Sequence, residues 1–144
     1  MIRIYTDGAW RRKNKAAGAG VAIIWNNGQI STYHRYLDDV TNNCAELEAI
    51  KLALVKVLLH VFSQENITLY SDSTYAIGML TQDWKAKANQ ELILEIKELL
   101  KNFPNLEFKW VKGHSKDKYN RLADTLANIA IDQHFNADKY HLQV

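Results

Sequence analysis

The order of strand-like and helix-like runs restricts the fold of this chain more than any other feature. Three runs, at residues 2–10, 18–25 and 29–37, alternate in the manner of β-strands. The tripeptide NNG between the last two runs is typical of a hairpin turn. The chain is therefore predicted to begin with three antiparallel strands.

Helix-like and strand-like runs alternate in the rest of the chain. The predicted elements are a helix from residue 42 to about 62, a strand at 66–72, helices at 73–84 and 89–102, a strand at 105–111 and a helix from 118 to about 135. Together they predict an α/β fold, a mixed five-stranded sheet with three antiparallel strands and then parallel additions, flanked by helices. We place one domain at residues 1–135 and a C-terminal tail at 136–144.

Composition excludes several classes of protein. Hydrophobic residues make up 47% of the chain, and no apolar run reaches the roughly 18 residues that cross a membrane. Cys44 is the only cysteine, so no disulfide forms within the chain and a cytoplasmic setting is expected. The net charge of +2 says little about partners, and the basic runs RRKNK and KWVKGHSKDK can each be a solvated face. We expect a monomer that does not associate with membranes.

Two predicted strands end in the same short pattern of an apolar residue, a tyrosine, a hydroxyl residue and an aspartate. The first reads IYTDG and contains Asp7, and the second reads LYSDS and contains Asp72. Each aspartate shares a face of its strand with the tyrosine two positions earlier. The carboxylates converge if the two strands are neighbours. Otherwise Asp72 is a helix cap and Asp7 begins a turn.

The long helix after the third strand offers a third carboxylate, with two candidates in CAELEAI. A helix turns about 100° per residue, which places the apolar residues from Leu47 to Val61 in one arc. Glu46 lies at the edge of this arc, whereas Glu48 points into solvent. Glu46 is therefore the candidate, although a favourable charge at a helix N-terminus would also explain it.

The last candidate residues lie in WVKGHSKDKYNRLAD, which runs from the end of the fifth predicted strand into the last predicted helix. A single histidine on a basic loop, such as His114, is more often solvated than catalytic. Asp124 lies opposite the core stripe of its helix, so periodicity places it on the outer or flanking side. Neither residue is assigned a role by pattern alone.

Five motifs in this order carry a resemblance to a known family: TDG, TNNCAEL, YSDS, VKGH and NRLAD. Over residues 2 to about 130 the chain resembles the type 1 ribonuclease H family. The resemblance implies the ribonuclease H-like fold and an endoribonuclease that hydrolyses the RNA strand of RNA–DNA hybrids, leaving 5′-phosphate and 3′-hydroxyl ends. It also matches Asp7, Glu46, Asp72 and Asp124 to four metal-binding carboxylates.

The cofactor that this resemblance implies is a pair of Mg²⁺ ions, with Mn²⁺ as an alternative, because an all-oxygen cluster suits a hard cation. Two ions about 3.5–4 Å apart would activate a water and stabilise the leaving 3′-oxygen. Asp7 is the candidate to bridge them. His114 matches a histidine that assists proton transfer or product release, and its ordinary pKa suits that role at neutral pH.

Contacts to the hybrid are implied at further positions. Asn42 and Asn43 match residues that contact the minor groove, where the RNA 2′-hydroxyl is displayed. Thr41 and Asn89 resemble a pocket that holds a phosphate of the DNA strand. Phosphate contacts read no sequence, so little sequence preference is expected.

The chain departs from the family pattern in three places. Asn14 lies in RRKNKAAGAG, where the family often has a Gly-rich loop, and it is a candidate hybrid contact with uncertain spacing from Asp7. Thr74 occupies a place where the family often has glutamine, which leaves that RNA contact open. TQDWKAKANQ is short where many bacterial members insert a basic handle, so this segment looks more like the retroviral domain.

Three other functions stay open at this stage. A hybrid- or duplex-binding module without catalysis would require the loss of a carboxylate, and none of the four is missing. A structure-specific DNA nuclease on the same fold is disfavoured by TNN and the GH loop. A domain of a reverse transcriptase ranks below a free-standing enzyme.

Overall fold

The computed structural model describes residues 1–60, 64–113 and 117–141 and contains one five-stranded sheet in the order β3-β2-β1-β4-β5. The strands are β1 (Ile2–Arg11), β2 (Ala16–Ile24), β3 (Ile30–Asp38), β4 (Ile67–Ser71) and β5 (Leu106–Trp110). β1 pairs antiparallel with β2, and β2 pairs antiparallel with β3, whereas β4 and β5 join in parallel. The predicted fold class is therefore confirmed.

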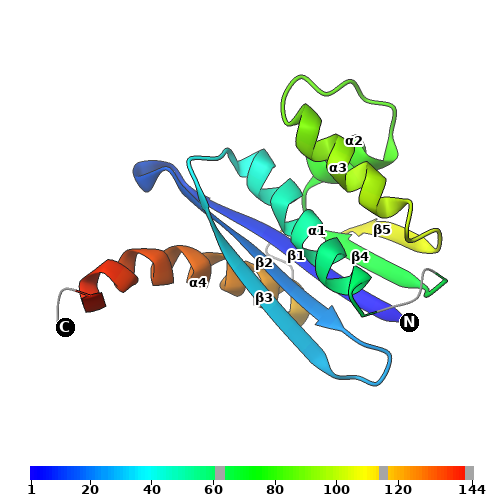
Figure 1. Cartoon of the computed structure of the whole chain (residues 1–144), viewed down its shortest axis with the longest axis horizontal. Helices are drawn as coiled ribbons and strands as arrows, with labels where there is room; N and C mark the ends of the chain where they lie inside the picture. Colours follow the sequence, from blue (N-terminus) through cyan, green and yellow to red (C-terminus); the bar gives the residue numbers. More distant parts are fainter. Residues whose placement is uncertain (61–63, 114–116, 142–144) are drawn as a thin grey trace.

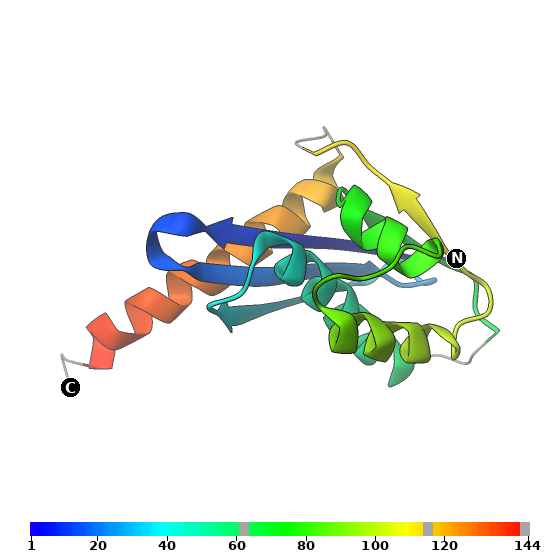
Figure 2. The ribbon, with the colours of Figure 1, turned by 90° about the horizontal axis from the view of Figure 1, so that it is seen from above.

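Four α-helices cover the two faces of this sheet (Figure 1). They are α1 (Asn42–Leu58), α2 (Thr74–Thr81), α3 (Gln90–Leu100) and α4 (Lys118–His141), and a short 3-10 helix, η1 (Arg12–Asn14), joins β1 to β2. Figures 1 and 2 show α1, α2 and α3 on one face and α4 on the other. The sheet therefore has a core on each side.

The larger core lies between the sheet and α1. Alternate residues of β1, such as Ile2 and Ile4, point to this face and pack with Leu47, Ile50 and Leu54 of α1, all of them buried. Burying an aliphatic side chain of this size stabilises a fold by about 1.5–3 kcal/mol. Thr41 fixes the start of α1, since its Oγ1 accepts a hydrogen bond from the amide of Cys44 over 3.1 Å. This core therefore fixes α1 over β1.

The opposite core is thinner, because the backbone of α4 lies almost directly on β2. A Cβ added at Gly20 would come within 2.1 Å of the main-chain oxygen of Ala123 and 2.6 Å of the main-chain nitrogen of Ala127. Only glycine leaves room for this approach, and the facing helix positions are alanines. The small residues therefore hold α4 against the strand that neighbours β1.

Three helix ends differ from the predictions, and the first is that of α2, which ends at Thr81 where the pattern predicted residue 84. α1 ends at Leu58, and its predicted end near residue 62 lies outside the described residues. α4 continues to His141, whereas the pattern ended it near residue 135. Its last turns extend past the sheet (Figure 1). Hydrophobic periodicity identifies a helix by the face that packs on a core, so it does not predict where these turns end. The predicted boundary between domain and tail thus falls inside a helix and stays a prediction.

Candidate active site

The two aspartates of the repeated pattern lie where the ladder between β1 and β4 ends, Asp7 inside β1 and Asp72 just after β4. Tyr5 of β1 is the register partner of Tyr70 of β4, and their rings stack with centroids 4.5 Å apart. Asp7 and Asp72 each follow two residues later, so they lie side by side just beyond this last pair of the β1–β4 ladder. Asp72 lies just beyond Ser71, the last residue of β4. The prediction that these two strands are neighbours is therefore confirmed.

Glu46 reaches the same place from the first turns of α1. β4 ends at Ser71, so the later residues of β1 have no strand partner on the β4 side. The amide of Gly8, in this part of β1, donates a hydrogen bond to Glu46 Oε1 over 3.0 Å. A Cβ at Gly8 would lie 2.6 Å from the amide nitrogen of Glu46, so glycine allows α1 to come this close. Glu48 is half-buried beside a different hollow, next to Lys51. The choice of Glu46 over Glu48 agrees with this geometry.

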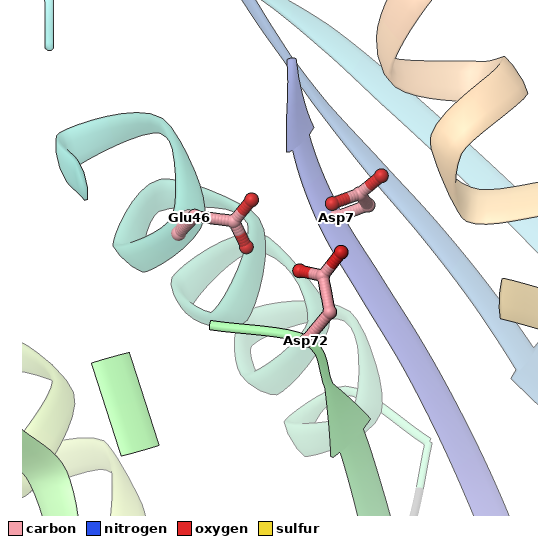
Figure 3. A group of neighbouring side chains, drawn as sticks. All are labelled: Asp7, Glu46 and Asp72. Atoms are coloured by element: carbon pink, nitrogen blue, oxygen red, sulfur yellow. The ribbon is translucent and has the colours of Figure 1, made fainter. Parts of the chain in front are cut away.

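Three carboxylates converge here, and Figure 3 shows the side chains of Asp7, Glu46 and Asp72 pointing toward one another. One oxygen from each lies within 4.8 Å of the others, and Asp7 and Glu46 are each only 6% exposed. Burial raises the pKa of Asp7, and repulsion from Glu46 and Asp72 raises it further. Burial and then Asp72 also raise the pKa of Glu46, against the hydrogen bond from Gly8. Without a cation, these groups resist ionisation.

The donors in this cluster fit a hard divalent cation. All the candidate ligand atoms are carboxylate oxygens, which Mg²⁺ and Mn²⁺ prefer. Glu46 Oε2 is buried and has no hydrogen-bond partner among the described residues, although a buried acceptor normally has one. A cation bound between the three groups would complete the coordination of this oxygen and remove the repulsion. The cluster is therefore a candidate metal centre.

A hollow of about 560 Å³ opens over the three carboxylates. Asp124, from the start of α4, lies on its rim and is exposed. It stands outside the group of atoms within 4.8 Å, yet it lies near enough to Asp7 to contribute to the raised pKa of that carboxyl. Its backbone oxygen accepts from Asn128 Nδ2 over 3.0 Å. Periodicity was right about its side of the helix, because the rim lies beyond the core.

The model of the RNase H family matches residues 1–132, which include all of these carboxylates. The chain belongs to the ribonuclease H family. The ribonuclease H of Wolbachia pipientis wMel is 39% identical to it, over 90% of this chain and 94% of the relative. That of Ruthia magnifica subsp. Calyptogena magnifica is 36% identical, over 92% and 96%.

Ribonuclease H structures share the fold as well. LC11-RNase H1, from compost, was solved in complex with an RNA/DNA hybrid and superposes with a TM-score of 0.81 at 28% identity. The match covers 94% of this chain and 99% of that one. The layers described above are thus those of a ribonuclease H.

Three of the predicted substrate residues line the hollow: Asn42 and Asn43 at the start of α1, and Thr74 at the start of α2. Their positions beside the carboxylates agree with a role at the substrate. Two aromatic residues, Trp10 and Tyr75, also line the hollow, and neither is among the predicted site residues. Trp10 is 42% exposed, a property that a single sequence does not reveal.

Thr41, Asn89 and Asn14 are not among the residues that line this hollow. Thr41 caps α1, and Asn89 precedes α3 in a left-handed conformation (φ 60°), with its Nδ2 donating to the hydroxyl of Tyr75 over 3.2 Å. Asn89 lies beside a second hollow, lined also by Cys44 and Lys87. Asn14 is exposed at the tip of the β1–β2 hairpin.

His114 lies outside the described residues, so its role stays a prediction. In the part of the chain that the structure describes, none of the helices combines the length and the apolar character that a membrane span requires.

Proposed function

We propose that this protein is an endoribonuclease that hydrolyses the RNA strand of RNA–DNA hybrids at the hollow over Asp7, Glu46 and Asp72. The observation that carries the proposal is the convergence of three carboxylate oxygens within 4.8 Å, two of the groups buried, in a chain of the ribonuclease H family. The hybrid bound by LC11-RNase H1 supports the same class of substrate here.

The cofactor in this proposal is a pair of Mg²⁺ ions, which Mn²⁺ can replace. Asp7, Glu46 and Asp72 would hold them, with Asp124 contributing from the rim of the hollow. When bound, two such ions supply an activated water and stabilise the leaving 3′-oxygen. One oxygen of Asp7 lies within 4.8 Å of oxygens of both Glu46 and Asp72, so Asp7 is the candidate that would hold both ions.

The remaining residues position the hybrid. Asn42 and Asn43 each carry an amide that donates and accepts, which suits a test for the 2′-hydroxyl in the minor groove. Thr41 and Asn89 would hold a phosphate of the DNA strand, which sets register without reading sequence. His114 would carry protons to or from the reacting groups.

The protein is also proposed to act in the cytoplasm as a monomer. Cys44, its only cysteine, is half-buried and free, which suits a reducing compartment. The four carboxylates come from one copy of the chain, so the site needs no residue of a second copy.

The decisive experiment compares one labelled RNA–DNA hybrid with double-stranded DNA, double-stranded RNA and both single strands, each with Mg²⁺ and with EDTA. We expect cleavage of the RNA strand of the hybrid alone, with 5′-phosphate products, and none in EDTA. Cleavage of double-stranded DNA would instead assign a DNA nuclease. Hybrid binding without cleavage in Mg²⁺ or Mn²⁺ would assign a binding module.

A further inference from the structure

We propose that Trp110 is a positioning residue for the carboxylate of Asp72, acting through a hydrogen bond from its indole N–H to the main-chain carbonyl of Asp72. This inference rests on the proposed function and adds a residue that acts through a metal ligand. Trp110 touches neither ion nor substrate in this role. It holds the backbone from which one ligand side chain leaves.

Asp72 lies on the short connection between β4 and α2, and its neighbours have hydrogen bonds of their own. The amide of Ser73 donates to Ser71 Oγ over 3.1 Å, and Ser73 Oγ accepts from the amide of Ala76 over 3.0 Å, which caps α2. The ladder between β4 and β5 ends at the pair Ser71 and Trp110. The carbonyl of Asp72 therefore lies beyond the last pair of the sheet.

Trp110 supplies the bond that the ladder no longer provides. Its Nε1 donates to the carbonyl oxygen of Asp72 over 3.1 Å, and the amide of Val111 donates to the carbonyl of Ser71 over 2.9 Å. Two successive carbonyls at the end of β4 are thus held from β5. The peptide plane after Asp72 helps to fix the direction of its side chain, which points toward Asp7 in Figure 3.

Burial does not explain a tryptophan at this position. Trp110 is 55% exposed and is the last residue of β5, which is an edge strand. Phenylalanine or tyrosine would suit an exposed strand position equally well, but neither has an N–H group on its ring system. The hydrogen bond to Asp72 is therefore the property that distinguishes tryptophan here.

The test compares Trp110→Phe with Trp25→Phe. Trp25 is a matched control, because its Nε1 also donates a hydrogen bond, to Ser31 Oγ over 2.7 Å, beside Ile2 and far along the sheet from Asp7. Both variants lose one indole hydrogen bond. Binding of Mn²⁺ to the substrate-free protein is measured by calorimetry, and kcat and KM are measured with the hybrid.

In Trp110→Phe we expect Mn²⁺ affinity to fall about three- to ten-fold, the factor that corresponds to one neutral hydrogen bond. The kcat should fall while KM for the hybrid stays the same. Trp25→Phe should keep the wild-type affinity and kcat. If Trp110→Phe fails to fold, benzothienylalanine introduced at position 110 alone keeps the ring shape, replaces the N–H with sulfur and should show the same loss.

Wild-type Mn²⁺ affinity in both Trp110 variants would overturn the inference and leave the proposed function intact. An equal loss in Trp25→Phe would also overturn it, because the effect would then be general. A wild-type protein that binds neither Mn²⁺ nor Mg²⁺ would overturn the proposed function together with the inference.

Discussion

At the scale of single residues, the buried carboxylates lower the stability of the metal-free fold but are the groups that the proposed reaction needs. Asp7 and Glu46 are buried, and each raises the free energy of the ionised cluster in the absence of metal. The same two groups are the best candidates to hold the ions. Substitutions here should therefore separate folding from catalysis.

Asp7→Asn should reduce cleavage about 10³-fold or more, because losing part of the charge that holds the metal ions costs several kcal/mol in the transition state. The metal-free variant should melt at a higher temperature than the wild type, since one buried repulsion is gone. Hybrid cleavage and thermal unfolding followed by circular dichroism measure the two effects. Near wild-type cleavage would contradict the two-ion assignment.

The stability of the metal-free protein should fall as pH rises. The folded pKa values of Asp7 and Glu46 lie above their unfolded values, so the folded state holds extra protons. That contribution is complete below the unfolded pKa values of about 4 and is lost as pH rises through the folded ones. Melting in EDTA from about pH 5 to about pH 8 tests the sign. Excess Mg²⁺ should flatten the curve, and a melting temperature that rises with pH would refute the argument.

Glu46→Gln and Glu48→Gln form a matched pair, two residues apart on α1. The first removes a charge from the buried cluster and should nearly abolish cleavage, with retained folding. The second changes a half-buried residue beside another hollow and should keep activity within about two-fold of the wild type, since surface changes of this kind are usually small. Equal losses in both variants would mean that the wrong face of α1 has been assigned.

At the scale of elements, the approach of α4 to β2 sets where Asp124 stands. Gly20→Ala would place a methyl group 2.1 Å from the oxygen of Ala123, so the helix must move, at a cost of about 1–3 kcal/mol or more. Gly113→Ala is the control, because the nearest atom to its added Cβ is Asp72 Oδ2 at 3.5 Å, an ordinary contact. Urea unfolding should show a large loss only for Gly20→Ala. Equal stability of both variants would show that α4 can shift freely.

Most elements could be predicted from the sequence, because the strands and helices alternate with clear periods. The parity of Tyr5 with Asp7, and of Tyr70 with Asp72, predicted which carboxylates share a face, and the register confirms it. The end of α4 could not be predicted from hydrophobic periodicity, since its last turns run past the sheet (Figure 1). The role of Asp124 came from the family resemblance, because a helical wheel locates only the core and not the rim.

At the scale of the whole molecule, we expect affinity for the hybrid to come from a small number of exposed lysine and arginine side chains. The segment between α2 and α3 is short and carries Lys85 and Lys87, both exposed. The tip of the β1–β2 hairpin adds the exposed Arg12, Lys13 and Lys15, and the region from Lys109 to Lys118 adds the exposed Lys109, Lys112 and Lys118. Few phosphate contacts mean weak binding and a high KM for the protein alone.

Double substitution of Lys85 and Lys87 by alanine should raise KM and reduce the slope of log affinity against log salt by about one to two units. The kcat should change little, because neither lysine lines the hollow over the carboxylates. Binding titrations at several salt concentrations and steady-state kinetics measure both effects.

Alanine at Lys97 and Lys101 is the control. It removes the same charge from α3, where Lys101 already pairs with Glu98 over 2.6 Å, and should leave the salt slope unchanged. A fall in kcat with constant KM in the Lys85 and Lys87 variant would place those lysines in the chemistry and refute this account.

The hollow itself could not be predicted from the sequence. Its lining comes from β1, α1, α2 and α4, and nothing in a single sequence marks which exposed aromatic residues face such a space. Trp10 and Tyr75 were missed for this reason. The bond from Trp110 to Asp72 was equally out of reach, because it depends on the parallel register and on a side-chain conformation.

The pairing of Tyr5 with Tyr70 also affects the order in which the strands pair during folding. β1 can pair with β2 early, through a short connection, but β1 and β4 join residues that are 65 positions apart (70 − 5). Closing so long a loop costs entropy before the contact repays it, so such pairings form slowly. During synthesis, Asp7 leaves the ribosome before Asp72, and both precede the last helix. The cluster of Asp7, Glu46 and Asp72 therefore cannot form before β4 has been synthesised.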